Sequence, residues 1–379
     1  MSFQLTPEQE AIRQAVREFG DAEIRPVARE YDESREYPEA IRKKAAEYDF
    51  VAPNIPEKYG GAGLDLLSVA VITEELWRAD AGIGSAISSA GFGTAMLIKY
   101  GDEWMKAEWL PKIAAGESVS ASAISEPAHG SNVAGMETQA ERDGDEWVIN
   151  GTKMWITNGN VADVAIVMAK TDPDAGHRGI TAFLVPTDTP GFTAHKIDNK
   201  LGIHASDLAE LTFENLRIPE ANVLGEVNKG FYQLMNFFAH GRISVASQAL
   251  GVAQAAVDEA ISYAGEREQF DQPIAEFQAI RHKIADMATN VEAARSLNYR
   301  AATAVEADDD ELAAKFASMA KLFASEHAVR VADEGLQVHG GAGFVTDHPA
   351  ERFYRDARIT KIYEGTSEIQ KNIIADRLL

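Results

Sequence analysis

The sequence predicts an α+β fold in which two helical segments flank a β-rich middle segment. Apolar residues recur with helical periodicity in the first hundred or so residues and again after about residue 225. Between these parts, short apolar runs bounded by Gly, Pro and Asp are typical of strands. A chain of 379 residues is long enough for about two or three domains. We therefore expect three domains, formed by residues 1–117, 118–225 and 226–379.

The N-terminal segment begins with a helix-start signal. Thr6 is suited to be the N-cap, Pro7 to occupy the first helical position, and Gln9 to complete a capping box. One helical face then carries the apolar residues Ile12, Val16 and Phe19. After Gly- and Pro-rich loops at 51–63, helical spacing resumes with Val69, Ile72, Leu76 and Trp77.

The middle segment carries the strand signals. Residues 147–156 form two apolar runs around Asn150-Gly151, the strongest short signal for a β-hairpin. Strand-like runs follow at 164–168, 180–185 and 211–213. This pattern predicts a β domain of roughly a hundred residues.

The C-terminal segment is helical again. A long apolar stripe predicts one extended helix, and it consists of Phe231, Leu234, Phe238, Val245, Ala249 and Val252. Ala-rich amphipathic patterns at 278–305 and 311–338 predict two more helices.

Composition excludes several function classes. Lys and Arg total 36 and Asp and Glu total 59, for a net charge of −23, which opposes binding to nucleic acid or an anionic membrane. The absence of Cys excludes disulfides, thiolate metal sites and Cys nucleophiles. Residues 1–8 lack the features of a signal peptide, and the weakly charged stretch 79–97 is too polar to span a membrane. We therefore expect a cytoplasmic protein.

Two motifs in the middle segment are candidates for ligand binding. In residues 123–132, backbone N–H groups around Gly130 and the hydroxyls of Ser125 and Ser131 are suited to hold carbonyl or phosphate oxygens. In residues 155–159, a Trp beside a Thr hydroxyl suits a flat heteroaromatic ring. A purely structural turn and a Trp packed in the β core are the respective alternatives.

Three further motifs lie in the C-terminal segment. Arg267 offers a guanidinium fork to phosphate, and the glycines of 340–343 allow close approach of a ligand to the backbone. Glu364 precedes Gly365 between apolar residues, so it is a candidate base if burial raises its pKa. The alternatives are a solvated charge, a loop that ends a helix, and a capping Glu before a helix that starts near Thr366.

In their order and spacing, these motifs resemble those of the acyl-CoA dehydrogenase family, over essentially all 379 residues. The motifs that carry the resemblance are Ser125-Glu126-Pro127 with Gly130-Ser131, residues 153–159, residues 267–270, residues 337–343 and Tyr363-Glu364-Gly365-Thr366. The resemblance implies a helical N-terminal domain, a middle antiparallel β barrel or sandwich, and a C-terminal four-helix bundle.

The resemblance also implies FAD, bound between the β domain and the C-terminal helices. Ser125 is expected to hydrogen-bond the pyrimidine edge of the flavin, Trp155 to flank the ring, and Thr157 to lie near N5. The stretch expected to border the flavin and its pyrophosphate also includes Ser122, Ile124, Gly130, Ser131 and Ile156. Near the adenosine side we expect Gly365, Thr366 and Glu368.

A further set resembles residues that the family gives to the FAD of a neighbouring subunit. This set comprises Arg267, Gln269, Phe270, Gln278, Gln337, Gly340 and Gly341. A cofactor held by two chains implies an oligomer, and the family is mostly tetrameric. We therefore expect a homotetramer arranged as a dimer of dimers.

The implied reaction is α,β-dehydrogenation of an acyl-CoA thioester, as in fatty acid β-oxidation, a part of lipid metabolism. Glu364 resembles the catalytic base that takes the α proton, while the β hydrogen leaves as hydride to flavin N5. The backbone N–H of Glu364 and a ribityl hydroxyl of the flavin are expected to donate hydrogen bonds to the thioester carbonyl. Substrate contacts are also expected from Ser131, Arg242, Tyr363 and Gly365, with Arg242 on the CoA arm. The family passes its electrons to electron-transfer flavoprotein.

The chain departs from the family pattern at several positions. Some branches carry the base just before the Arg of the long helix, but here Gly241 occupies that position and leaves Glu364 as the sole candidate. Asn132 and Ala239 replace residues that are commonly Asp, and His240 is available as a compensating hydrogen-bonding group. An acyl-CoA oxidase-like enzyme and a non-catalytic scaffold are alternative functions. Small side chains at 85–93 suggest a short-to-medium or branched acyl chain.

Overall fold

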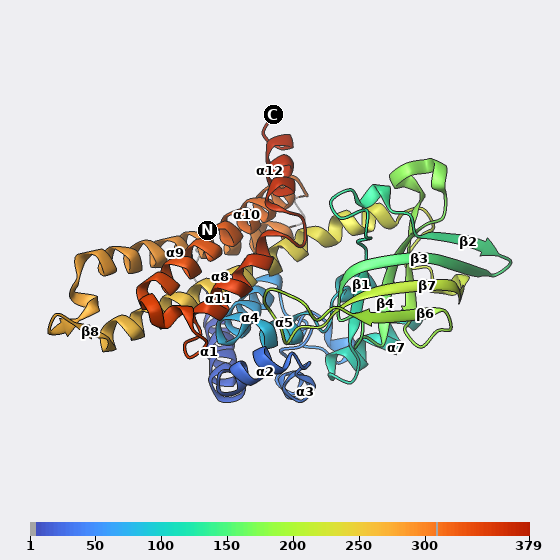
Figure 1. Ribbon diagram of the computed structural model, residues 1–379. Helices are drawn as coiled ribbons and strands as arrows, with labels where there is room; N and C mark the ends of the chain where they lie inside the picture. The colour runs from blue at the N-terminus through green and yellow to red at the C-terminus, as the bar shows by residue number, and fades with distance from the viewer. Residues whose placement is uncertain (1–4, 308–309) are drawn as a thin grey trace.

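The computed structural model describes residues 5–307 and 310–379, and it has helices at both ends of the chain with a sheet between them (Figure 1). The opening residues used in the targeting argument are therefore described only from Leu5 onward. The N-terminal helices are α1 (Pro7–Phe19), α2 (Ala28–Ser34), α3 (Glu39–Ala46), α4 (Leu66–Ala79), α5 (Ala81–Ser88), α6 (Thr94–Tyr100) and α7 (Glu103–Ala114). Of the described helices, none is both long and apolar enough to cross a membrane.

Helix α1 begins as its sequence predicts. The Thr6 hydroxyl accepts a hydrogen bond from the Gln9 N–H at 3.2 Å, and the Gln9 side chain accepts one from the Thr6 N–H at 3.0 Å. This reciprocal capping box satisfies two backbone donors that a helix N-terminus otherwise leaves unpaired. Val16 and Phe19 are buried on the predicted face.

The middle segment folds into one seven-stranded sheet in the order β1-β4-β2-β3-β7-β6, with β5 paired to β4. Its strands are β1 (Ser120–Ala123), β2 (Gln139–Asp143), β3 (Glu146–Thr157), β4 (Val164–Lys170), β5 (Ile180–Pro186), β6 (Phe192–Lys196) and β7 (Leu208–Pro219). The sheet curls around its own core, because Trp147 of β3 packs edge-on against Phe183 of β5, although these strands are not neighbours.

The predicted fold class is confirmed, with one correction to the sheet. Most strand pairs are antiparallel, as expected, but β1 runs parallel to β4, and β2 also meets β4 in parallel. Strands β4 and β5 are buried on both faces, since one face packs on the N-terminal helices and the other lines the curl of the sheet. Burial on both faces explains why these strands are continuous apolar runs rather than alternating ones.

The predicted hairpin at Asn150-Gly151 is wrong. Strand β3 continues through these residues, and the turn of the hairpin lies instead between β2 and β3, at Gly144-Asp145. The register with β7 shifts between Ile149 and Gly151, which marks a β-bulge. Gly is required there, because a Cβ at Gly151 would lie 2.5 Å from the Thr138 hydroxyl oxygen.

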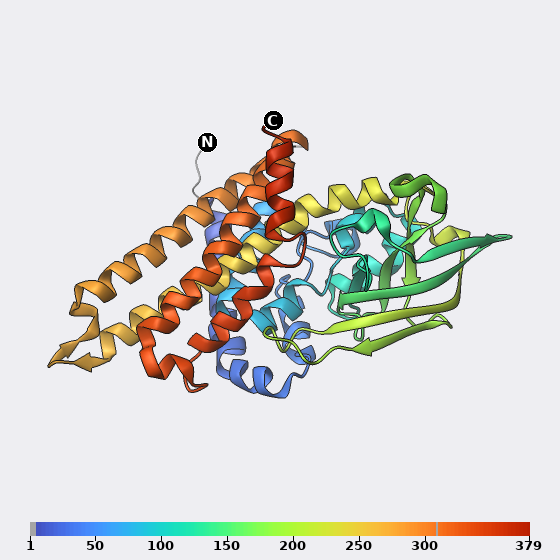
Figure 2. The same cartoon turned by 45° about the horizontal axis from the view of Figure 1, so that its top comes forward.

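The C-terminal segment contains α8 (Gly230–Glu266), α9 (Gln278–Glu306), α10 (Asp310–His339), α11 (Ala350–Ala357) and α12 (Ser367–Asp376). The three long helices α8, α9 and α10 pack together, and the short α11 packs on α8 and α10 as the fourth member of the bundle. Figures 1 and 2 show α8 running from the sheet to the far end of the bundle. There the short hairpin β8–β9 (Glu268–Gln269 and Gln272–Pro273) connects it to α9.

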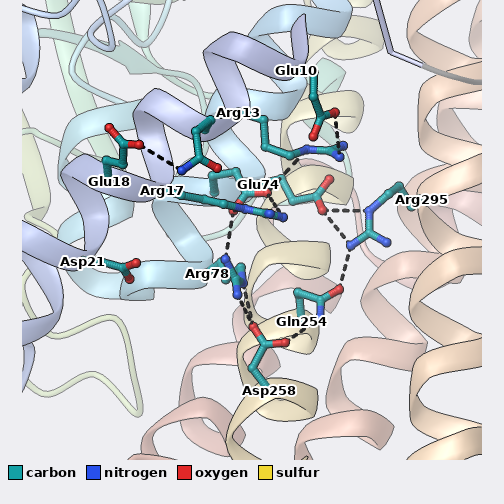
Figure 3. A network of polar contacts seen from close by, with 12 residues as sticks. Glu10, Arg13, Arg17, Glu18, Asp21, Glu74, Arg78, Gln254, Asp258 and Arg295 are labelled. Atoms are coloured by element: carbon teal, nitrogen blue, oxygen red, sulfur yellow. Dashed lines mark hydrogen bonds and ion pairs between the residues drawn. The ribbon is translucent and has the colours of Figure 1, made fainter. Parts of the chain in front are cut away.

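Two buried carboxylates on α4 join the N-terminal helices to this bundle (Figure 3). Glu74 accepts hydrogen bonds from Arg295 of α9 at 2.9 Å and from the Tyr299 hydroxyl at 3.2 Å. Glu75 accepts two from Arg17 of α1, both at 2.9 Å. A buried carboxylate is tolerated only when cations and donors surround it, so these contacts fix how α1, α4 and α9 pack.

Replacing Glu74 with Ala should lower the free energy of unfolding by about 3 kcal/mol, because Arg295 and Tyr299 would keep their burial but lose their main acceptor. Urea unfolding at fixed protein concentration measures this change. The matched control is Glu33→Ala, which removes an exposed pair with Arg29 and should cost no more than about 0.5 kcal/mol. Equal losses in the two variants would show that the buried network does not hold the helices together.

Candidate active site

Glu364 lies on a tight turn between α11 and α12. Its φ is +53°, which is uncommon for a residue with a side chain, and the φ of Gly365 is +89°. The turn is held from outside, since the buried Gln370 amide donates to the carbonyl oxygens of Glu364 and Gly365 at 3.1 and 2.8 Å. Helix α12 begins next to Thr366, as the alternative interpretation expected, but its N-cap is Thr366 and not Glu364. Strained backbone held by its surroundings is typical of functional sites.

Lys321 on α10 also supports this turn, and sequence reasoning missed it. The side chain is fully buried, and its ammonium group donates to the Gly365 carbonyl at 2.7 Å. Burial lowers the pKa of Lys321 to about 8, although Glu364 opposes that shift. Its only signal in the sequence was a charged residue within an otherwise small and apolar helical stripe.

The Glu364 carboxylate lies against helix α8 at Gly241. A Cβ built on Gly241 would be only 2.6 Å from Glu364 Oε2, so any larger residue there would displace the carboxylate. Glu364 as a whole is half-buried, but Oε2 is enclosed and makes no hydrogen bond to any described residue. The structure therefore brings together the two positions that the sequence compared as alternatives for the base.

The electrostatics of Glu364 suit a base that works near neutral pH. Burial raises the pKa of Glu364 to about 7, while the nearby cations Arg242 and Lys321 limit the rise. Desolvation disfavours the carboxylate, and a cation restores part of its stability. A perturbed carboxyl group with an unpaired oxygen is a functional-site candidate on physical grounds.

Arg242 and Tyr363 adjoin the same carboxylate. Arg242 is 7% exposed, and its Nε has no hydrogen-bond partner among the described residues. Burial lowers the pKa of Arg242, and the neighbouring Glu364 opposes that shift. The Tyr363 hydroxyl donates to the Gln248 side chain of α8, which joins the residue before Glu364 to the same helix.

Trp155 is the most unusual residue of the sheet. Its φ is +65°, it lies where the register between β3 and β7 shifts between Lys153 and Ile156, and it is 60% exposed. A bulge that turns an aromatic side chain outward forms a flat platform. Ile156 is buried beneath it, and Thr157 ends the strand half-buried. The alternative of a Trp packed in the β core is excluded by this exposure.

The segment 122–131 runs beside this platform. The Ser125 carbonyl accepts a hydrogen bond from the Met154 N–H at 2.9 Å, which joins the segment to the bulge. Ser122 is buried, and its hydroxyl has no hydrogen-bond partner among the described residues. Ile124 is buried, whereas Gly130 and Ser131 are exposed.

An ion pair between Glu126 and Lys153 joins the segment 122–131 to the strand that carries Trp155. Sequence reasoning missed the role of this ion pair. Lys153 is fully buried and donates to Glu126 at 2.9 Å and to the Ile124 carbonyl at 3.1 Å. Glu126 also accepts from the Thr138 N–H at 2.9 Å. Burial alone would raise the pKa of Glu126, but Lys153 and these donors lower it to about 2.

The residues expected to serve a neighbouring subunit lie away from Glu364 in this chain. Arg267, Gln269 and Phe270 belong to the β8–β9 hairpin, which lies at the opposite end of α8 from the sheet (Figure 1). The remaining members of the set are Gln278, Gln337, Gly340 and Gly341. All seven residues are exposed. Glu368 is likewise exposed, in the first turn of α12.

The small residues of 85–93 do not leave open space. Ser85, Ala86, Ile87 and Ala90 are buried in the core. A Cβ on Gly91 would lie 2.5 Å from the Ala52 side chain, and one on Gly93 would lie 2.6 Å from the Ser122 hydroxyl. Close packing of α5 and its following turn therefore accounts for the small side chains.

Comparison with known proteins gives matches along the whole chain. The family models described as the N-terminal, middle and C-terminal domains of acyl-CoA dehydrogenase match residues 6–117, 121–216 and 228–379. The mitochondrial short-chain specific acyl-CoA dehydrogenase of Mus musculus is 44% identical over 379 residues, which cover 100% of this chain and 92% of that protein.

Two solved structures have the same fold. Butyryl-CoA dehydrogenase from Megasphaera elsdenii superposes with a TM-score of 0.95 at 38% identity, and all of both chains is covered. A chain from the structure of the electron transferring flavoprotein of Acidaminococcus fermentans also gives a TM-score of 0.95, at 40% identity and with full coverage of both chains.

The pair Glu126–Lys153 yields a stability prediction. Lys153→Met should destabilise the protein by about 3 kcal/mol, because Glu126 would lose the buried cation that pairs with it, and Glu126→Leu in the same chain should restore part of the loss. Urea unfolding measures both variants, and limited proteolysis reports opening of residues 124–138. Lys196→Met, at an exposed position of β6, is the control. A Lys153→Met protein as stable as this control would contradict the assignment.

Proposed function

The chain belongs to the acyl-CoA dehydrogenase family, and from that premise we propose that Glu364 is its catalytic base and takes the α proton of an acyl-CoA thioester. Members of this family are FAD-dependent oxidoreductases that dehydrogenate acyl-CoA. The observation that carries the proposal is the Glu364 carboxylate, enclosed against Gly241 with one oxygen unpaired and a pKa near 7. A base whose pKa lies close to the working pH combines availability with proton affinity.

The described residues fit a bound flavin. Trp155 supplies an exposed flat face, and the Ser122 hydroxyl is a buried polar group that lacks a partner. We assign the flavin and its pyrophosphate to these residues and to Ile124, Ser125, Gly130, Ser131, Ile156 and Thr157. We assign the adenosine side of FAD to Gly365, Thr366 and Glu368. FAD, when bound, supplies the acceptor for the hydride that leaves the β carbon.

The chain's own groups orient the thioester. No described residue accepts a hydrogen bond from the Glu364 N–H, so this donor is free for the thioester carbonyl, where negative charge grows as the α proton leaves. The unpaired Nε of Arg242 is a donor for the CoA arm, and the exposed Ser131 hydroxyl is a second one. These groups, with Tyr363 and Gly365, form the substrate contacts that we propose.

The exposed residues at the β8–β9 end of α8 support the proposal that the protein forms an oligomer. Phe270 is 88% exposed and Phe344 is 83% exposed, and large apolar side chains on this scale commonly mark an interface. We propose that this end meets a second copy, in which Arg267, Gln269, Gln278, Gln337, Gly340 and Gly341 contact the FAD. The resulting assembly is a homotetramer, and its electron acceptor is electron-transfer flavoprotein.

The packing of residues 85–93 favours a short acyl chain, because the small residues of this segment pack closely in the core and leave little space for a long chain. Both the mouse relative and the Megasphaera structure are named for short-chain or butyryl substrates. We expect butyryl-CoA to bleach the flavin absorption fastest in a panel of straight and branched acyl-CoAs. Preference for a long chain would contradict this assignment, and rapid consumption of dioxygen with acyl-CoA would identify an oxidase instead.

Glu364→Gln should retain FAD and bind acyl-CoA, yet lose turnover by about 10²–10⁴-fold, because an amide of nearly the same shape cannot accept the α proton. Flavin absorbance and stopped-flow bleaching by butyryl-CoA measure the two properties separately. Glu108→Gln, which changes an exposed carboxylate of α7 that has no part in the proposed site, is the control and should bleach normally. Normal turnover in Glu364→Gln would show that another group is the base.

The pH profile tests the same group through Lys321. Because the base must be ionised, kcat/KM should fall as pH drops through about 7, the pKa of Glu364. The Lys321 cation lowers that pKa, so Lys321→Met should move the midpoint to higher pH, whereas Lys321→Arg should largely preserve it. Lys283→Met, which removes a partly exposed partner of Glu334, should leave the midpoint unchanged. An unshifted midpoint in Lys321→Met would limit Lys321 to a purely structural role.

A further inference from the structure

A cluster of metal-ligating side chains lies in the C-terminal bundle, away from the proposed active site. Glu259 of α8, His339 at the end of α10 and His348 just before α11 each offer one ligand atom, and these atoms all lie within 4.8 Å of one another. On α8, Glu259 is about five helical turns from Gly241, roughly 27 Å along the axis. The proposed reaction therefore makes no use of this cluster.

His339 is held in the form that a metal requires. Its ring is buried, and Nδ1 lies 2.7 Å from the Gly335 carbonyl, which can only accept a hydrogen bond, so Nδ1 carries the hydrogen. In the neutral ring Nε2 then carries the lone pair, and it has no hydrogen-bond partner among the described residues. Metal-bound histidines are commonly oriented by just such a bond from the other ring nitrogen to a carbonyl.

The other two groups face this lone pair. Glu259 Oε1 lies 3.8 Å from His339 Nε2 and 3.8 Å from His348 Nδ1. Tyr263 stacks on the His339 ring at 4.3 Å between centroids and contacts His348 edge-on, which fixes the approach of both rings.

We propose that Glu259, His339 and His348 bind one divalent transition-metal ion, with Zn²⁺ as the best match to two imidazoles and a carboxylate. Ligand atoms around a tetrahedral Zn²⁺ are roughly 3.4 Å apart, given bonds of about 2.0–2.1 Å. The two distances from Glu259 to the histidine nitrogens, both 3.8 Å, must therefore shorten by a few tenths of an ångström, while the ligand atoms all start within 4.8 Å of one another. His348 is partly exposed in a short loop and can make that adjustment, and water completes the fourth position.

The bound ion would join three separate pieces of chain. It would fasten the end of α10 and the loop before α11 to α8, next to the exposed residues Gln337, Gly340 and Gly341. A structural site of this kind stabilises the folded state by mass action, whatever the activity of the enzyme. The proposal therefore does not depend on the assignment of Glu364.

The test uses the full-length, FAD-loaded protein after treatment with a chelator. Calorimetric titration with Zn²⁺ should show one site per chain, and the melting temperature should rise with excess Zn²⁺. Co²⁺ should give a visible band of tetrahedral type on the long-wavelength side of the flavin absorption, and Zn²⁺ should abolish it. His348→Ala changes only a partly exposed loop residue and should weaken Zn²⁺ binding by more than tenfold.

Two further variants decide between a metal site and a plain ion pair. Glu259→Gln should also weaken Zn²⁺ binding by more than tenfold, whereas His195→Ala, at an exposed position of β6, should leave it unchanged. If the unmodified protein binds less than one Zn²⁺ per chain, or if His348→Ala and His195→Ala bind it equally well, the cluster is an ion pair of Glu259 and the proposal is wrong.

Discussion

The site depends on a single steric constraint, the contact between the Glu364 carboxylate and the bare backbone of α8 at Gly241. Only Gly leaves room for the carboxylate there, and the same enclosure removes water from Oε2 and raises the pKa of Glu364. The positive φ of Glu364 is the backbone cost of aiming the side chain at the helix. Gln370 and Lys321 offset that cost, because they bind the carbonyls of the same turn.

The two halves of the site are built differently. Around Glu364 the supports are neutral donors and one buried ammonium group that hold a strained turn. On the sheet, a fully buried ion pair, Lys153 with Glu126, holds the segment that carries Ser125 beside the bulge that carries Trp155. In both cases a buried charge holds a neighbouring part of the proposed site in place.

Much of this could be predicted from the sequence, and the misses have physical causes. The capping box at Thr6 and the helical stripe of α8 depend on neighbours within a few residues, so local pattern was enough. Asn150-Gly151 has the local sequence of a hairpin turn, but Gly151 lies on a β-bulge instead, where Thr138, distant in sequence, packs closely against it. Lys153, Glu126 and Lys321 were missed as supports because each acts through a partner far along the chain. The Glu364–Gly241 contact was implied only by resemblance, since no local pattern brings residues so far apart together.

Helix α8 has a mechanical consequence. It runs unbroken over 37 residues, about 55 Å at 1.5 Å per residue, and no proline interrupts it. Gly241, against which the Glu364 carboxylate lies, is thus joined by one continuous helix to the start of the β8–β9 hairpin. In the oligomer that we propose, a neighbouring copy that contacts the hairpin would act on the same helix that carries Gly241. The position of the Glu364 carboxylate and the contact between subunits would then be linked through one helix.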